Sequence, residues 1–200
     1  MAGPSMKMET DTNLTMRKSR KLLLGAVIVA AIVFAAGLLI PYSFRNPVDG
    51  ATCNDYNQES YWYYPWGTSV THKGVDIFKA KGTPVRPAAG VEFVLFAGHR
   101  GGKGGNIAIT LAPKWRMHYY AHMDEVRTRR FAIVTHDSVI GTVGNTGNAV
   151  NTPAHLHFSI MSLLPHPWDI DDSPHGKWKA LYMNPVKHLN EYHSRNNQID

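Results

Sequence analysis

Hydrophobic residues follow two different patterns along this chain. From Leu22 to Ile40, a continuous apolar run of nineteen residues contains no charged side chain. As an α-helix, a run of this length is sufficient to cross the hydrocarbon core of a bilayer. From about residue 60 onward, the apolar residues instead form short runs, rich in β-branched and aromatic types and separated by Gly, Pro and Asn. This second pattern predicts strands joined by turns.

The charges around the apolar run predict its orientation. The segment RKSRK, residues 17–21, lies directly before the run, whereas only Arg45 lies close behind it. Because basic residues concentrate on the cytoplasmic side of a membrane, we expect the N-terminus inside and residues 41–200 outside. A cleaved signal peptide is the alternative, but its apolar region usually has about 7–15 residues and ends in a small-x-small cleavage site. No such site follows Ile40, which favours a retained anchor in the cytoplasmic (inner) membrane.

The chain therefore has an expected organisation of four segments: a cytoplasmic tail at residues 1–21, a transmembrane anchor at 22–40, a stalk at 41–58 and a folded domain at 59–200. Within that domain, periodicity and turn residues predict strands at 74–78, 91–98, 105–112, 116–123, 138–144 and 155–161. No long amphipathic helix is evident beyond the anchor, and residues 164–179 read as one large loop. These features predict a mainly β, antiparallel fold.

Charge and cysteine content narrow the classes of partner. The formal net charge is +6, but residues 1–21 hold five basic and two acidic side chains, against sixteen and thirteen in residues 41–200. The small excess in the domain, without a basic run interleaved with aromatic residues, gives no indication of nucleic-acid binding. Cys53 is the single cysteine, so a disulfide within one chain is excluded. We expect it to be a small buried residue.

The stretch PAHLHFSI, residues 153–160, contains two histidines at alternate positions. Alternate residues of a strand share a face. One face then carries His155, His157 and Ser159, and the other carries Leu156, Phe158 and Ile160. Two imidazoles on one face can be solvated surface residues, so this motif alone does not identify a site.

Two further motifs change that interpretation. In THKGVDI, residues 71–77, His72 and Asp76 share a strand face with Gly74 between them, and YYAHMD, residues 119–124, places His122 near the end of an aromatic strand. Zinc in hydrolytic sites usually takes three protein ligands from His and Asp or Glu, and leaves one position for water. Two or three of these side chains could bind metal, and the others could transfer protons. No HExxH motif and no GxSxG motif is present.

The order of the motifs identifies a family resemblance. HKGVD, GTPVRPAAG, GGNIAITLAPKWRMHYYAHM, VGNTGN, HLHF and MNPVKHL occur in the order seen in the lysostaphin-type (LytM-like, M23) zinc metallopeptidases. The resemblance covers about residues 66–190. It implies a small antiparallel sheet that forms a cleft, of the lysostaphin/LytM (duplicated hybrid motif-like) type. It departs from the usual pattern at Ala154, directly before His155, and in the long loop 164–179.

The resemblance also implies a role for each residue. His72, Asp76 and His157 match the family's zinc ligands, and His122 and His155 match its two catalytic histidines. Which of the last two is the general base is left open. The other histidines are expected at the surface: His99, His118, His136, His166, His175, His188 and His193. Trp62, Trp66 and Trp168 could line a substrate groove or simply pack.

These expectations combine into a membrane-anchored zinc endopeptidase. Its catalytic domain would lie outside the cytoplasmic membrane, and the resemblance implies peptide cross-links or stem peptides of peptidoglycan as substrate. The alternative is a non-catalytic envelope module that binds peptidoglycan or activates a partner hydrolase, and a proteinaceous substrate other than peptidoglycan is a third candidate. A regulatory protein partner and autoinhibition by loop 164–179 are also left open. The complete ligand set favours the enzyme.

Overall fold

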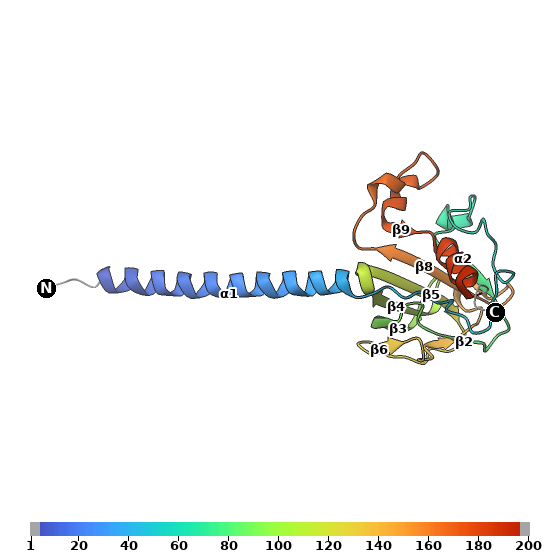
Figure 1. The fold of residues 1–200 in the computed structure, drawn as a ribbon, viewed down its shortest axis with the longest axis horizontal. Helices are drawn as coiled ribbons and strands as arrows, with labels where there is room; N and C mark the ends of the chain where they lie inside the picture. Colours follow the sequence, from blue (N-terminus) through green and yellow to red (C-terminus); the bar gives the residue numbers. More distant parts are fainter. Residues whose placement is uncertain (1–4, 197–200) are drawn as a thin grey trace. The chain divides into compact units, whose positions relative to one another are not determined.

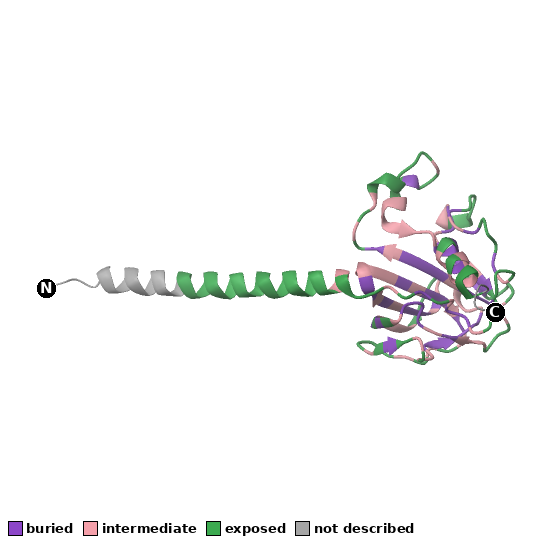
Figure 2. Cartoon of the chain, viewed as in Figure 1, coloured by how far each residue is buried: buried purple, intermediate pink, exposed green. Residues whose placement is uncertain are grey.

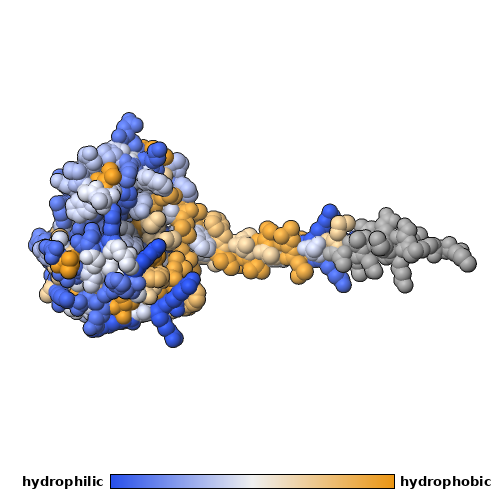
Figure 3. All heavy atoms as spheres, turned by 180° about the vertical axis from the view of Figure 1, so that it is seen from behind, coloured by the Kyte–Doolittle hydropathy of each residue, from blue (hydrophilic) through white to orange (hydrophobic). Residues whose placement is uncertain are grey.

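The computed structural model describes the backbone of residues 5–196 and the side chains of residues 16–196. It divides into two units, Met1–Ile40 and Pro41–Asp200. The first unit contains one helix, α1 (Ser5–Leu39), which begins well before the expected anchor. An 18-residue window within its Met16–Leu39 portion has a mean hydropathy of 2.9, enough to cross a membrane, although a signal sequence near an N-terminus passes the same test. Its side chains are mostly exposed and apolar (Figures 2 and 3).

The second unit is built on an antiparallel sheet whose strands differ in length (Figure 1). Its strands follow the order β1 (Val75–Phe78), β8 (His155–Ser162), β5 (Arg116–Met123), β4 (Gly105–Ala112), β3 (Val91–Arg100) and β6 (Ile133–Thr135). A further short strand, β9 (Tyr182–Met183), pairs with β8, and a separate ribbon joins β2 (Pro84–Val85) to β7 (Gly141–Thr142). The mainly β, antiparallel fold expected from the sequence is confirmed.

Short 3₁₀ helices connect several of these strands. They span Gly67–Ser69, Pro113–Trp115, Gly147–Ala149, Pro167–Asp169 and Gly176–Leu181. The expected strand at 138–144 is much shorter in the structure, where only Gly141–Thr142 pairs with β2. Gly141 has no room for a side chain, because an added Cβ would lie 2.5 Å from the Glu125 carbonyl oxygen.

The core lies on one face of the sheet and follows the alternation expected for β8. Leu156, Phe158 and Ile160 are fully buried, and Ile77 and Tyr120 from neighbouring strands are buried with them. Burying a large apolar side chain contributes about 1.5–3 kcal/mol to the free energy of unfolding. In Figure 2, purple along the strands marks their buried residues. The opposite face of the same strands is therefore free to carry polar side chains.

A second helix, α2 (Pro185–Asn196), was not expected. Asn184 precedes it and accepts a hydrogen bond from the Val186 backbone N–H through Oδ1, at 3.0 Å. An Asn cap followed by Pro is a typical start for a helix. Val186 and Leu189 are buried against the core, so the helix presents an apolar stripe that the sequence reading missed.

The segment 41–58 differs from the expected stalk. Phe44, Val48 and Tyr56 are buried members of the core. The Arg45 backbone N–H also donates to the Ala88 carbonyl oxygen at 2.8 Å. Apolar side chains at these positions gain more from burial in the domain than from exposure in an extended stalk, so this segment is part of the folded domain. Cys53 is exposed rather than buried.

Candidate metal centre and catalytic histidines

Strand register brings two of the expected metal ligands together. In the β1–β8 pair, Asp76 lies opposite His157. Directly opposed residues in an antiparallel pair have Cβ atoms about 4.5–5.5 Å apart. Here Asp76 Oδ1 and His157 Nδ1 are separated by 2.8 Å. The third residue, His72, lies just before β1, and its Nε2 is 3.1 Å from Asp76 Oδ1 and 3.0 Å from His157 Nδ1.

The His72 ring is held from its other side. Its Nδ1 donates to the Ser60 carbonyl oxygen at 2.9 Å, and Ser60 Oγ lies 3.0 Å from the same nitrogen. The indole of Trp66 packs on the ring, with centroids 4.3 Å apart and planes inclined by 31°. Because a neutral imidazole that donates from Nδ1 carries its lone pair on Nε2, this arrangement aims a lone pair at Asp76 and His157.

These three side chains fit a divalent metal. In a neutral His72, the Nε2 atom and the Asp76 carboxylate oxygen are both acceptors, and a cation between them would satisfy both. Two imidazole nitrogens and one carboxylate oxygen are a donor set typical of zinc, whose bonds to them are about 2.0–2.2 Å. Tetrahedral bonds of that length place ligand atoms roughly 3.3 Å apart, close to the 2.8–3.1 Å found between these atoms.

The charge state of the group suits the same purpose. Burial acts to raise the pKa of Asp76, but the neighbouring rings of His157 and His72 outweigh it and hold the pKa well below its ordinary value. Burial lowers the pKa of His157, although Asp76 opposes that effect. At neutral pH the carboxylate is therefore ionised, and His157 tends toward the neutral form that can bind a metal.

His122 reaches this group through a β-bulge. Regular alternation would place His122 on the same face as Tyr120, which is buried in the core. The register between β4 and β5 shifts after Tyr120, so that Ala121 and His122 together oppose one residue of β4. His122 has φ of 62°, and such a bulge redirects the following side chain. Its ring consequently lies 5.9 Å from that of His157.

The two expected catalytic histidines are held in the same way. His122 Nδ1 donates to the Thr146 carbonyl oxygen at 2.9 Å, and His155 Nδ1 donates to the Pro153 carbonyl oxygen at 2.8 Å. Their ring centroids are 5.1 Å apart. Burial, with a smaller contribution from His157, lowers the pKa of His122 to about 4, so that ring is neutral at pH 7. In the neutral form, a ring that donates from Nδ1 retains a lone pair on Nε2.

The structure thus brings all five sequence-selected side chains to one place on the sheet. Gly74 lies against β8, where an added Cβ would lie 2.5 Å from the Phe158 carbonyl oxygen and 2.9 Å from His157 Cε1. Sequence reasoning missed the supporting groups. The Ser60 carbonyl oxygen, far from its partner along the chain, had no local signal, whereas Ser159, 3.0 Å from His157 Nε2, lies on the expected polar face.

The loop at 164–179 lies beside the segment that carries His72. The Trp62 indole Nε1 donates to the Pro174 carbonyl oxygen at 3.0 Å, and Lys73 Nζ lies 3.1 Å from His175 Nδ1. Within the loop, Asp171 accepts from Lys179 Nζ at 2.5 Å. The loop is therefore fastened both to itself and to residues next to the site. Trp62 is buried by this packing, whereas Trp168 is exposed.

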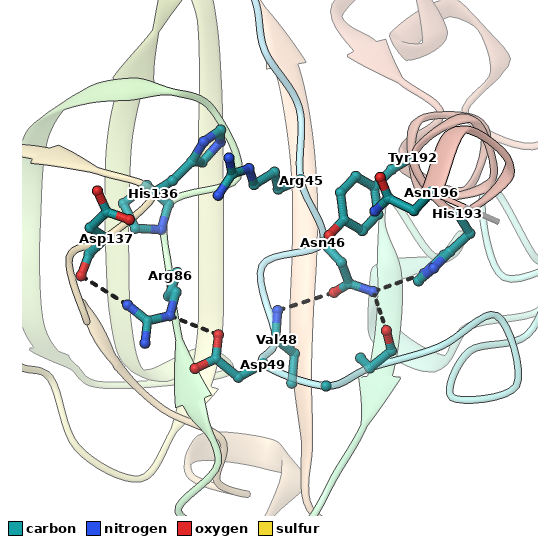
Figure 4. A pocket seen from close by; sticks show the side chains of 13 residues that line it. Arg45, Asn46, Val48, Asp49, Arg86, His136, Asp137, Tyr192, His193 and Asn196 are labelled. Atoms are coloured by element: carbon teal, nitrogen blue, oxygen red, sulfur yellow. Dashed lines mark hydrogen bonds and ion pairs between the residues drawn. The ribbon is translucent and has the colours of Figure 1, made fainter. Parts of the chain in front are cut away.

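A cavity of about 440 Å³ lies elsewhere, between segment 45–51, residues 86–87 and 136–137, and α2 (Figure 4). Its polar groups are largely paired with one another. Arg86 donates from Nε to Asp49 Oδ1 at 2.7 Å and from Nη1 to the Asp137 carbonyl oxygen at 2.8 Å. Asn46 Nδ2 lies 3.2 Å from His193 Nε2. None of the five sequence-selected residues lines this cavity. The contact between Asn46 and His193 instead connects segment 41–58 to α2.

Comparison with known proteins agrees with this geometry. The model of peptidase family M23 matches residues 70–170, just over half of the chain. The glycyl-glycine endopeptidase ALE-1 of Staphylococcus capitis is 30% identical over 112 residues, which are 54% of this chain and 30% of that protein. The chain thus spans less than a third of this curated relative.

Solved structures share the fold. The catalytic domain of lysostaphin from Staphylococcus simulans superposes with a TM-score of 0.54 at 26% identity, over 69% of this chain and 95% of that one. A variant of the catalytic domain of the prophage-encoded M23 protein EnpA from Enterococcus faecalis gives 0.50 at 18% identity, over 72% and 92%. On the strength of the family match, supported by this fold, the chain belongs to peptidase family M23.

Proposed function

We propose that this chain is a zinc-dependent endopeptidase that hydrolyses peptide bonds of peptidoglycan. The observation that carries the proposal is the convergence of His72 Nε2, Asp76 Oδ1 and His157 Nδ1 within 3.1 Å of one another, beside His122 and His155. Zinc bound there would polarise the scissile carbonyl and lower the pKa of a water molecule into the neutral range.

In this proposal, His122 and His155 transfer the protons. Both rings donate from Nδ1 to a backbone carbonyl, so Nε2 of each is the atom free to exchange a proton. One Nε2 accepts the proton of the attacking water, and the resulting imidazolium can deliver it to the leaving amine. The other ring, when protonated, stabilises negative charge that develops on the carbonyl oxygen. Because both rings have the same Nδ1 contact, either Nε2 could be the one that accepts the proton.

The substrate and the location in this proposal are supported by the relatives and by α1. Relatives include a protein named glycyl-glycine endopeptidase and the antimicrobial peptidase lysostaphin, which supports peptide bonds of the cell wall as substrate. The helix α1 supports a single-pass anchor in the cytoplasmic membrane, with RKSRK inside and the peptidase domain outside. The residue roles, the tail at residues 1–21 and the anchor at residues 22–40 are part of this proposal.

The test uses the full chain in detergent with purified peptidoglycan. New peptide ends are followed by mass spectrometry, with a chelator and after zinc is added back. We expect zinc-dependent release, and a His155→Ala variant that releases peptides about 10²–10⁴-fold more slowly. His99→Ala, which changes an exposed histidine away from the site, is the matched control. Bound zinc without release would indicate either another substrate or an enzyme inhibited by its own loop 164–179, and the absence of both would favour the non-catalytic envelope module.

A further inference from the structure

We propose that a cationic cavity next to the candidate metal centre binds a free carboxylate of the peptide substrate. This inference rests on the proposed function and names a chemical feature of its substrate. The cavity has a volume of about 220 Å³ and is lined by Arg100, Gly101, Lys103, Gly104, Ile107 and Tyr119. It contains two cations and no acidic side chain.

The cavity shares a wall with the histidine group. The Tyr119 ring lies 6.0 Å from the His157 ring, nearly at right angles to it. Its hydroxyl packs on Gly104, where an added Cβ would lie 2.2 Å from the hydroxyl oxygen. The Gly104 carbonyl oxygen in turn accepts a hydrogen bond from the His122 backbone N–H at 2.9 Å. A peptide held at the metal centre would therefore have this cavity within reach of a neighbouring residue.

A third cation, Lys73, lies close to Lys103, because both side chains contact Ser69. Lys73 directly follows His72, and its Nζ donates to the Ser69 carbonyl oxygen at 2.9 Å. Lys103 Nζ donates to the Ser69 hydroxyl at 3.1 Å. The two ammonium groups thus share one serine, which places their positive charges close together. Like charges gathered at a cleft attract anions to it.

Among the described residues, these cations have no acidic partner, unlike Lys79, Lys81, Arg86, Arg127 and Lys179 of the same domain. Over the part of the chain that the structure describes, no carboxylate forms an ion pair with Lys73, Arg100 or Lys103. By contrast, Arg86 in the larger cavity is paired with Asp49 at 2.7 Å (Figure 4). Charge left unpaired beside a binding site is available to a ligand, whereas charge that is already paired is not.

The chemistry and size of the cavity indicate what it binds. A guanidinium binds a carboxylate through two parallel hydrogen bonds, and an ammonium adds a point charge. A volume of about 220 Å³ is too small for a drug-sized ligand, which needs about 300–1,000 Å³. It suits one carboxylate-bearing side chain or chain end, so we infer a substrate with a free carboxylate close to the scissile bond rather than an uncharged glycine bridge.

Binding is tested separately from cleavage, with the full-length His155→Ala variant in detergent and loaded with zinc. Soluble peptidoglycan fragments are prepared in two matched forms, with their peptide carboxylates free or amidated, and affinities are measured by calorimetry. We expect the Kd of the free form to be roughly tenfold lower than that of the amidated form. The preference should weaken as salt is raised, because exposed charges are screened.

Adding Arg100→Gln and Lys103→Gln should remove the preference, whereas Arg129→Gln and Lys187→Gln, exposed cations outside this cavity, should preserve it. All four side chains are exposed, and thermal unfolding checks that each variant is folded. Equal affinity for both fragments, a preference that survives the double change, or no binding of either fragment would overturn the inference. If the unmodified chain cleaves peptidoglycan but shows no such preference, the proposed function stands and the carboxylate inference fails. If the preference is found but the unmodified chain cleaves nothing, the carboxylate inference stands and the proposed function fails.

Discussion

Two histidine–carboxylate groups lie on opposite faces of the same sheet. On the core face, Glu92 Oε1 lies 2.7 Å from His118 Nδ1. On the other face, Asp76 Oδ1 lies 2.8 Å from His157 Nδ1. The two distances are nearly equal, and β5 contributes a histidine to each face. The surroundings of the two carboxylates are nevertheless different.

The core group is saturated with hydrogen bonds. Glu92 accepts from the Ala89 backbone N–H at 2.7 Å, from the Tyr120 hydroxyl at 3.0 Å and from the Thr110 hydroxyl. The other nitrogen of His118 lies 2.8 Å from the Tyr42 hydroxyl. Both Glu92 and His118 are fully buried. Buried charges are tolerated when such partners are present, so this group is structural, and His118 is not the surface residue expected from the sequence.

The group on the other face, which comprises Asp76, His157, His72, His122 and His155, has too few donors for its acceptors. Nδ1 of His72, His122 and His155 each donates to a backbone carbonyl, which leaves their Nε2 atoms as acceptors in the neutral rings. The comparison teaches that burial and short distances alone do not distinguish a structural pair from a binding site. The balance of donors and acceptors does, because only an unbalanced group gains from an added cation or proton.

The largest effect that would test this comparison is loss of metal. We expect Asp76→Asn to reduce bound zinc from about one per chain to almost none, while far-UV circular dichroism stays unchanged. Glu92→Gln is the matched change on the other face and should leave zinc content per folded chain unaltered. The measurement is elemental analysis of the purified full chain after dialysis against zinc. Equal zinc loss in both variants would contradict the distinction between the two faces.

A smaller effect is expected on stability from the core face. Glu92→Gln leaves His118 buried without its carboxylate, so we expect the free energy of unfolding to fall by about 3–5 kcal/mol. Chemical denaturation of the metal-free chain measures this change, and Asp76→Asn is the comparison variant. A loss of less than about 1 kcal/mol would mean that the Glu92 network is not the structural element described here.

The same variant carries a pH signature. Burial acts to raise the pKa of Glu92, but the charge and hydrogen bond of His118 outweigh it and lower the pKa below its ordinary value. A lowered carboxyl pKa stabilises the fold above the unfolded pKa of about 4.3, and this contribution is lost as pH falls through the lower folded value. Glu92→Gln should therefore reduce the acid dependence of unfolding below that pH.

The smallest effect concerns the group that orients His72. Ser60→Ala removes a hydroxyl 3.0 Å from His72 Nδ1 but leaves the Ser60 carbonyl oxygen that accepts from the ring. Changes to such supporting groups typically lower metal affinity about 10–100-fold, and the effect here should lie near the lower end. Competition with a zinc chelator measures it, and Ser43→Ala, at an exposed serine, is the control. Unchanged affinity would show that the carbonyl oxygen alone orients the ring.

Sequence patterns predicted the parts of this domain that depend on local periodicity. The alternation in β8 placed Leu156, Phe158 and Ile160 on one face, and all three are fully buried. The signals for α2 were also local, because Asn184 and Pro185 begin it and Val186 and Leu189 form its buried stripe, but they were missed. Local signals exist wherever one element's own hydrogen bonds and one buried face determine its form.

Positions that depend on distant partners could not be predicted in this way. Phe44 and Val48 looked like parts of a stalk because their contacts, at Ala89 and Val85, lie about forty residues further along the chain. His118 looked like a surface residue because its partner Glu92 lies on another strand. A short polar segment with a few apolar residues does not show by its own sequence whether those residues pack against a core formed by distant segments.

By itself, the sequence determined the residue types of the candidate site, the strands that carry most of them and the family that their order resembles. Only the tertiary structure decided how those residues meet. The bulge at Ala121 and His122 turns one histidine toward the cleft, register sets Asp76 against His157, and folding leaves Lys73 and Lys103 on one serine without an acidic partner among the described residues. Each outcome depends on pairing between segments far apart in the chain, and pairing is determined by which arrangement buries the core and satisfies its hydrogen bonds.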